Sequence, residues 1–166
     1  MKIIDIALIG IMSAILVAVQ VALSFLPNIE LVTLLIIIYT LVFGKKSLYI
    51  IYVFVAIEGI IYGISLWWIN YLYIWTVLFT IVMLLRKQQS TYFWAIISGF
   101  YGLTFGALCS IPNLFLSGIG SAVSYWISGI PFDILHAVGN FVVTLLLFHP
   151  LYQVLNTINK KTANMD

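Results

Sequence analysis

Long apolar stretches, interrupted only by a few short basic segments, constrain this chain more than any other feature. All of its lysines and arginines lie in these breaks or near the chain ends: Lys2, Lys45, Lys46, Arg86, Lys87, Lys160 and Lys161. A membrane span needs about 20 predominantly apolar residues, so each interval between basic segments has room for two crossings. Short loops rich in lysine and arginine stay in the cytoplasm, and six crossings place every basic residue there.

The sequence therefore predicts an all-α integral membrane protein with six transmembrane helices and both termini cytoplasmic. Hydrophobic residues make up 64% of the chain and charged residues 7%, against roughly 25% charged residues in soluble domains. Backbone groups inside lipid must be satisfied internally, which favours helices. We expect a single six-helix domain over residues 1–166, multi-pass in the cell membrane and in contact with lipid.

Prolines and glycines suggest where the helices begin and end. We expect helices over about 3–26, 29–43, 47–65, 91–111 and 131–156, with a further one before Arg86. Pro27 and Asn28 end the first helix, Pro131 occupies a first-turn position of the last, and Pro150 bends its inner end. The outer connections are then 27–28, 65–70 and 112–129, the last being the longest.

Several function classes lack support in the sequence. The single cysteine, Cys109, excludes an internal disulfide and a cysteine-based metal cluster. No catalytic motif is present, so we expect no enzyme, no catalytic residue, no metal and no cofactor in this chain. The net charge of +2 comes from the cytoplasmic loops and indicates no nucleic-acid partner. No helix carries a polar stripe from end to end, as a channel would need.

Two helices carry rows of small residues, which allow close helix packing in membranes. The first helix has Gly10, Ala14, Ala18 and Ala22 at intervals of four residues. This row serves either packing within the chain or docking of a different membrane subunit. The fifth helix has a similar row at Gly99, Gly102 and Gly106, and the sequence leaves open which row faces inward.

Glu58 is the most costly residue for a membrane location, at about 2.5–3.5 kcal/mol for a charged side chain at the centre of a span. It lies between Ile57 and Gly59 in a stretch with no other charge. Tyr62 follows four residues later, on the same helix face. Such carboxylates usually face a cavity or a partner, although a protonated carboxyl bonded to a tyrosine would serve packing alone. We favour a substrate-binding role for Glu58 and Tyr62.

Asp133, His136 and Asn140 form a second polar group on one face of the last helix, at intervals of three and four residues. Taken one at a time, each of these residues could have a purely structural role. Asp133 could interact with the helix dipole, His136 could be a satisfied interior histidine, and Asn140 could bridge two helices. Together they indicate a polar-lined cavity in the outer half of the membrane.

Glu30 lies at the outer start of the second helix, where it serves as a helix cap, a site residue or both. The outer segments are also rich in aromatic and amide side chains, which belong either to a membrane-interface belt or to a ligand pocket. We include four of them in the predicted site: Trp67, Trp68, Asn113 and Trp126. Polar groups concentrate in the outer half, which suggests a pocket open outside and closed below.

The chain resembles the substrate-binding S components of energy-coupling factor (ECF) transporters over nearly its whole length. The resemblance rests on the size, the expected topology and the small-residue row of the first helix, which begins with Gly10 where the family often has alanine. The most specific part is the stretch GIPFDILHAVGNF at residues 129–141, which is similar to the last-helix segment of many S components.

This resemblance implies a vitamin-capturing subunit that docks through its first helix onto a membrane scaffold (T) protein carrying two ATPases. ATP would be used by those partner subunits. Ala14 and Ala18 would face the scaffold. Asp133, His136 and Asn140 would line the pocket, with residues 112–129 as part of its lid. The S component would topple in the membrane to release its load.

Two alternatives follow for function. The first is a subunit that captures a nutrient, and the second is an accessory or scaffold membrane protein without a transported ligand. The predicted pocket contains Glu30, Glu58 and Asp133 but no lysine or arginine. It would repel an anion at close range, so we expect a neutral or cationic substrate rather than biotin, folate or pantothenate.

Overall fold

The computed structural model describes residues 2–26 and 28–163, and all of its regular elements in these ranges are helices, with no strand. Its elements are α1 (Ile3–Ala22), α2 (Val32–Phe43), the 3-10 turn η1 (Gly44–Lys46), α3 (Ser47–Tyr62), α4 (Leu66–Leu85), α5 (Thr91–Cys109) and α6 (Ile111–Ala163). The predicted all-helical class is confirmed. Pro27, predicted to help end the first helix, lies outside the described residues.

Five helical stretches of the described chain are long and apolar enough to cross a membrane. They are Ile3–Ala22, Val32–Tyr62, Leu66–Leu85, Thr91–Cys109 and Ile111–Thr162. The second stretch combines α2 and α3, because α2 has only 12 residues. A helix of that length rises about 18 Å, which is less than the hydrocarbon thickness of about 30 Å.

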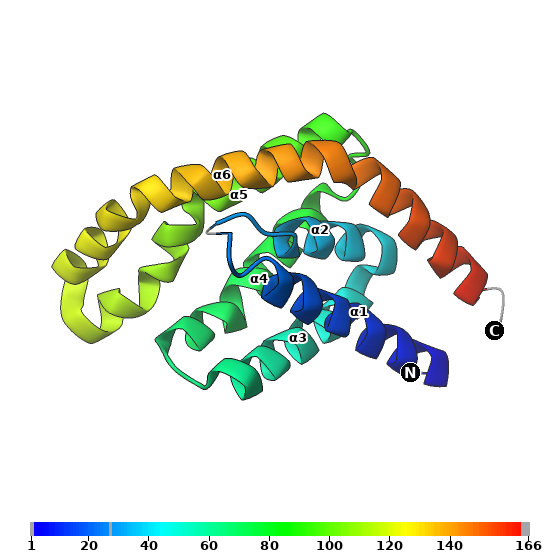
Figure 1. Cartoon of the computed structure of the whole chain (residues 1–166), viewed down its shortest axis with the longest axis horizontal. Coiled ribbons are helices and arrows are strands. Elements are labelled where there is room, and N and C mark those ends of the chain that lie inside the picture. Colours follow the sequence, from blue (N-terminus) through cyan, green and yellow to red (C-terminus); the bar gives the residue numbers. More distant parts are fainter. Residues whose placement is uncertain (1, 27, 164–166) are drawn as a thin grey trace.

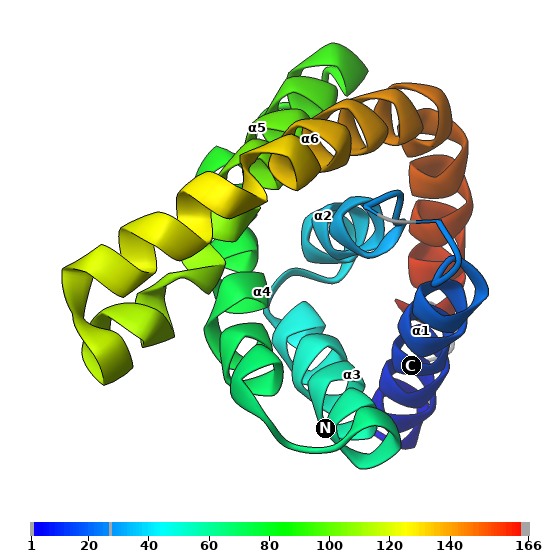
Figure 2. The same ribbon diagram turned by 60° about the vertical axis from the view of Figure 1, so that its left-hand side comes forward.

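The central helix of the molecule is α2. The other helices surround it in the view of Figure 2, and every residue from Val32 to Thr40 is buried. Its sequence, VTLLIIIYTLVF, has almost no polar side, as expected for a helix enclosed by protein on all sides. Since other helices shield α2 from lipid, it can be shorter than a free-standing span.

The glycine row of α5 forms the contact with α6. A Cβ atom added to Gly102 would lie 2.9 Å from the carbonyl oxygen of His136, and one at Gly99 would lie 3.2 Å from that of Ala137. Gly106 packs directly beneath the carboxylate of Asp133. The row therefore faces inward and lets the two helix backbones approach closely.

In contrast to the α5 row, the small-residue row of α1 faces outward, away from the other helices. Gly10, Ala14, Ala18 and Ala22 are all exposed, and a Cβ at Gly10 would meet nothing within 4 Å. The neighbouring face of α1 attaches the helix to α3, where the buried hydroxyl of Ser13 donates a hydrogen bond to the Ile50 carbonyl at 2.9 Å. Packing within this chain therefore does not explain the row.

The start of the last helix differs from the prediction. Instead of a connection over 112–129, the chain is helical from Ile111 onward and reverses at Gly118, whose φ of 83° suits glycine. Pro131 lies inside α6 rather than in its first turn. Interior prolines occur in membrane helices because neighbouring groups satisfy the freed backbone. The segment forms a helical hairpin that projects from the body (Figure 1).

Other predicted boundaries shift by a few residues. Helix α1 ends at Ala22 rather than near 26, and α2 begins at Val32 rather than 29. The predicted outer connection 65–70 is mostly the first turn of α4, which begins at Leu66 after Ser65. The described residues of segment 23–31, which are 23–26 and 28–31, are irregular, so the connection between α1 and α2 is longer than predicted.

The basic segments gather at one end of the molecule. Lys46 forms an ion pair with Asp5 at 2.5 Å, beside the N-terminus. The Asn159 amide donates to the Val42 carbonyl at 3.1 Å, which brings the end of α6 to the end of α2. The two chain ends also lie on the same side of Figure 1.

The connection between α4 and α5 reaches the same region. The Trp94 indole donates a hydrogen bond to the Gln88 carbonyl at 3.1 Å and stacks on Phe148 of α6, with ring centroids 6.5 Å apart. Segment 23–31, the turn at 63–65 and the hairpin lie at the other ends of these same helices.

Candidate functional site

A cavity of about 630 Å³ opens at the end of the molecule opposite the lysines. Ligand pockets typically enclose about 300–1,000 Å³. Its walls come from the end of α1, the residues between α1 and α2, the end of α3, the first half of α4, the last part of α5 and the middle of α6. The lining residues are Gln20, Leu23, Ser24, Leu26, Asn28, Ile29, Glu30, Glu58, Tyr62, Trp67, Tyr71, Trp75, Phe105 and His136.

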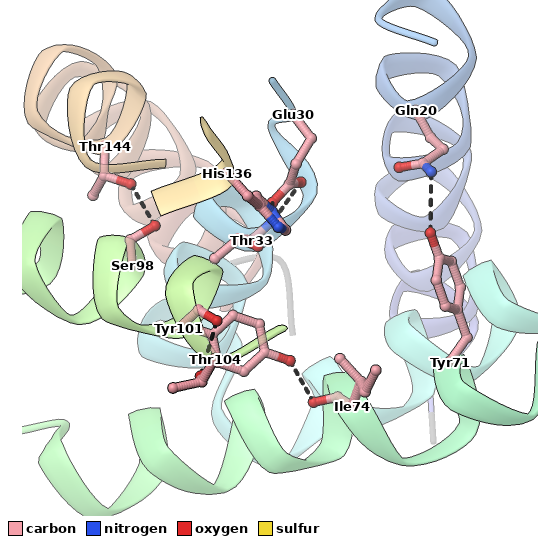
Figure 3. A network of polar contacts seen from close by, with 10 residues as sticks. All are labelled: Gln20, Glu30, Thr33, Tyr71, Ile74, Ser98, Tyr101, Thr104, His136 and Thr144. Atoms are coloured by element: carbon pink, nitrogen blue, oxygen red, sulfur yellow. Dashed lines mark hydrogen bonds and ion pairs between the residues drawn. The ribbon is translucent and has the colours of Figure 1, made fainter. Parts of the chain in front are cut away.

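The irregular segment before α2 forms one wall, with Glu30 as its principal polar residue. Glu30 accepts a hydrogen bond from the Thr33 backbone N–H at 2.9 Å, in the first turn of α2. Its other carboxylate oxygen lies 3.3 Å from Nε2 of His136 on α6. Figure 3 shows this bridge between segments over 100 residues apart in sequence. Glu30 therefore bonds to the first turn of α2 and also lines the cavity.

The charge of Glu30 is stabilised by these partners. Burial opposes ionisation, but the hydrogen bonds and the charge of His136, together with the hydrogen bonds of Thr33, outweigh it. They hold the pKa of Glu30 below its usual value. Each oxygen of Glu30 thus already has one partner within the chain. Glu30 is therefore a preformed part of the wall.

Glu58 is the open carboxylate of the cavity. Its side chain is on α3, 2% exposed, and lines the cavity. Its Oε1 atom has no hydrogen-bond partner among the described residues. Leaving a buried polar oxygen unpaired is costly, so a ligand that partners the Glu58 carboxyl group would remove that cost. Tyr62, one turn further along α3, also lines the cavity and is half-exposed at its mouth.

Aromatic rings form a continuous wall from the mouth to the Glu30–His136 pair. Tyr62 packs edge-on against Trp67, Trp67 against Tyr71, and Tyr71 against Trp75. The series continues through Phe105 to the His136 ring, with centroids 4.9 Å apart in the last contact. Such edge-to-face contacts fix the rings and leave parts of their faces available to a flat ligand.

Trp75 adds a second unpaired polar atom. Its side chain is 2% exposed, and its indole Nε1 has no hydrogen-bond partner among the described residues. An indole nitrogen can only donate. Two deeply buried polar atoms of the lining residues thus lack a partner among the described residues, an acceptor on Glu58 and a donor on Trp75.

A hydrogen bond joins α1 to α4 across the cavity wall. The Gln20 amide donates to the Tyr71 hydroxyl at 3.1 Å, as Figure 3 shows. Gln20 follows Ala18 on α1 by two residues, so the helix carries a cavity-lining residue and the exposed small-residue row on different faces. A displacement of α1 would therefore reach the cavity through Tyr71.

Three predicted site residues lie away from the cavity lining. Trp68 packs on Gly59, and its indole donates to the Val55 carbonyl at 2.8 Å, so it attaches α4 to α3. Trp126 is exposed on the projecting hairpin. Asn113 is in the first turn of α6 and half-buried.

Asp133 and Asn140 are buried at 5% and 1% exposure but are not among the lining residues either. Asp133 accepts a hydrogen bond from the Gly106 backbone N–H at 2.9 Å, in the contact between α5 and α6. One oxygen of Asp133 and both polar atoms of the Asn140 amide lack partners among the described residues. Of the predicted stripe on α6, the structure brings only His136 to the cavity.

Sequence reasoning missed several lining residues. Trp75 and Phe105 lie inside apolar stretches and carry no distinguishing signal, while Tyr71 resembled a membrane-interface residue. Gln20 did carry a signal, because it is a polar side chain within an otherwise apolar helix. Segment 23–31 could not be placed without the true ends of α1 and α2.

Comparison of the chain with protein-family models, with curated proteins and with solved structures finds no match.

Proposed function

We propose that this chain is the substrate-capturing membrane subunit of an ECF-type importer. It binds a vitamin or related micronutrient from outside the cell and delivers it to a scaffold protein with two ATPases, which use the ATP. The observation that carries the proposal is the cavity itself: it is of ligand size, is walled by aromatic rings and contains the buried, unpaired carboxylate of Glu58.

The location of the cavity supports capture from outside. The basic segments lie at the opposite end, and six crossings with both termini in the cytoplasm would expose the cavity mouth externally. Beneath the cavity, the apolar residues Ile36, Ile37 and Ile38 of α2 are fully buried. A pocket that is open outside and closed below fits capture rather than conduction.

The outward face of α1 supports delivery to a partner. Its exposed row of small residues would let a helix of a scaffold protein approach closely. Within the part of the chain that the structure describes, all four residues of that row are exposed and no packing contact accounts for it. Ala14 and Ala18 lie at its centre and are the residues that we assign to scaffold contact.

The proposal is tested by mass spectrometry of small molecules released from the full chain, purified gently in detergent from cells grown in rich medium. Glu58→Ala is the test variant. Asp133→Asn is the matched control, because it alters another buried carboxylate that does not line the cavity. We expect a compound that is released from the wild type and the control but is absent from Glu58→Ala.

The other outcomes are equally informative. Equal amounts of the same compounds in all three samples would contradict a capture role for the cavity. If the chain also purifies without an ATPase-bearing partner, an accessory membrane protein without a transported ligand becomes the better description. In that case, polar groups such as Asp133 serve only to join helices.

A further inference from the structure

The two carboxylates of the cavity differ in what they can offer a ligand. Both oxygens of Glu30 are engaged, by Thr33 and His136. Oε1 of Glu58 is buried and has no partner among the described residues. An occupant that gives the Glu58 carboxyl group a partner would therefore supply a hydrogen bond that the described chain does not.

The rest of the lining restricts the charge of that occupant. No lysine or arginine is among the lining residues, so an anionic group would meet Glu58 without a compensating cation. Aromatic faces attract cations through the ring quadrupole, with indole the strongest. Trp67, Tyr71 and Trp75 form one continuous wall of such rings.

The occupant also needs a hydrogen-bond acceptor and a flat shape. Trp75 Nε1 is a buried donor without a partner, and an acceptor atom on the ligand would satisfy it. Flat rings can stack on the aromatic wall with little loss of conformational freedom. These features favour a planar ring that carries an acceptor group together with either a positive charge or an N–H donor for Glu58.

We propose that the cavity binds an organic cation built on a heteroaromatic ring, with its positive group against Glu58 and an acceptor group toward Trp75. The inference rests on the proposed function, because it names the class of molecule captured. A neutral ring with an N–H donor is the competing occupant, since it could also satisfy Glu58 Oε1. Charge is therefore the property to vary.

Three probes on one pyridine ring vary charge at nearly constant size: the cation 1-methylnicotinamide, neutral nicotinamide and the anion nicotinate. Each is titrated into the full chain in detergent, and binding is followed by quenching of tryptophan fluorescence, since Trp67 and Trp75 line the cavity. We expect the cation to bind at least about 10-fold more tightly than nicotinamide. Nicotinate should bind most weakly.

Three variants separate charge recognition from general damage. Glu58→Gln keeps the shape of the side chain and removes its charge, so it should weaken cation binding about 10-fold and abolish the preference over nicotinamide. Asp133→Asn is the control for a buried carboxylate outside the lining and should retain the preference. Trp75→Phe should weaken nicotinamide and 1-methylnicotinamide to the same extent, because both present an amide acceptor.

Binding of nicotinamide or nicotinate as tightly as the cation would overturn the inference. So would the lack of any fluorescence response to the cation, or equal losses in Glu58→Gln and Asp133→Asn. If the compound released from the purified wild type is neutral or anionic, the cation inference fails while the capture function stands. If no probe binds and no compound depends on Glu58, both fail together.

Discussion

At the scale of single residues, the site combines one carboxylate that has hydrogen-bond partners within the chain and one that has a buried oxygen without a partner. Glu30 is fixed by His136 and by the first turn of α2, whereas Glu58 presents a buried oxygen without a partner. The sequence identified both acids because charge is rare and costly in apolar helices. It could not tell which one was already paired, since the partner of Glu30 lies more than 100 positions away.

The Glu30–His136 pair leads to a prediction about pH. Glu30→Gln should lower the free energy of unfolding at pH 7 by about 1.5–3 kcal/mol, the range for hydrogen bonds to charged groups. Because the pKa of Glu30 is lowered in the folded state, its contribution is present above the unfolded pKa and lost as pH falls through the folded one. The difference between wild type and variant should therefore shrink below about pH 4.

Denaturant unfolding in detergent at several pH values measures this difference. The difference in the free energy of unfolding between wild type and variant could instead stay constant down to the lowest pH. That result would show that the Glu30 charge adds nothing to stability through His136 and Thr33.

At the scale of helices, two rows of small residues with similar helical spacing have different surroundings. The α5 row lies against the backbone of α6, and the α1 row is exposed. Spacing predicted that both helices would permit close contact. Which row packs inside the chain depends on how each helix is rotated about its axis, and neighbouring helices decide that.

Gly102 and Gly10 provide a matched test of the inward row. Gly102→Ala would place a Cβ 2.9 Å from the His136 carbonyl oxygen, whereas Gly10→Ala meets nothing within 4 Å. We expect Gly102→Ala to destabilise the protein by about 1–3 kcal/mol. Gly10→Ala should be neutral or slightly stabilising, because alanine favours helix. Thermal unfolding in detergent measures the stability of both variants. Equal losses of stability in the two variants would contradict the close α5–α6 contact.

The exposed row gives a prediction about the proposed scaffold. Ala14→Leu should reduce the amount of scaffold and ATPases that purifies with the chain by about 10-fold or more, because leucine keeps a partner helix at a distance. Ala56→Leu makes the same change on an exposed position of α3 and should leave the complex intact. Losses of similar size in both variants would argue against docking through α1.

At the scale of the whole molecule, the basic segments and the cavity lie at opposite ends. Contacts from Lys46 to Asp5, and from Asn159 to Val42, join elements that the sequence separates widely. The hairpin at Gly118 projects beyond the body at the end away from the lysines (Figure 2). Its side chains are not among those that line the cavity.

A labelling experiment tests the proposed orientation in the membrane. In a Cys109→Ser background, Lys87→Cys and Gly120→Cys each place one exposed thiol at opposite ends of the molecule. A membrane-impermeant maleimide should label position 120 in intact cells and position 87 only after permeabilisation. Labelling of both positions from the same side would contradict the proposed topology.

Helical class, apolar character and the clustering of basic residues followed from composition and local pattern, because hydrophobic runs and charges are properties of short segments. The rarity of charge in apolar stretches also pointed to Glu30 and Glu58, and the polar stripe of the last helix pointed to His136 together with Asp133 and Asn140. The cavity itself depended on the tertiary structure. The burial of α2, the early end of α1 and the helical hairpin in place of a loop all arise from contacts between distant segments. These contacts set Glu58 and Trp75 in the same wall and removed Asp133 and Asn140 from it.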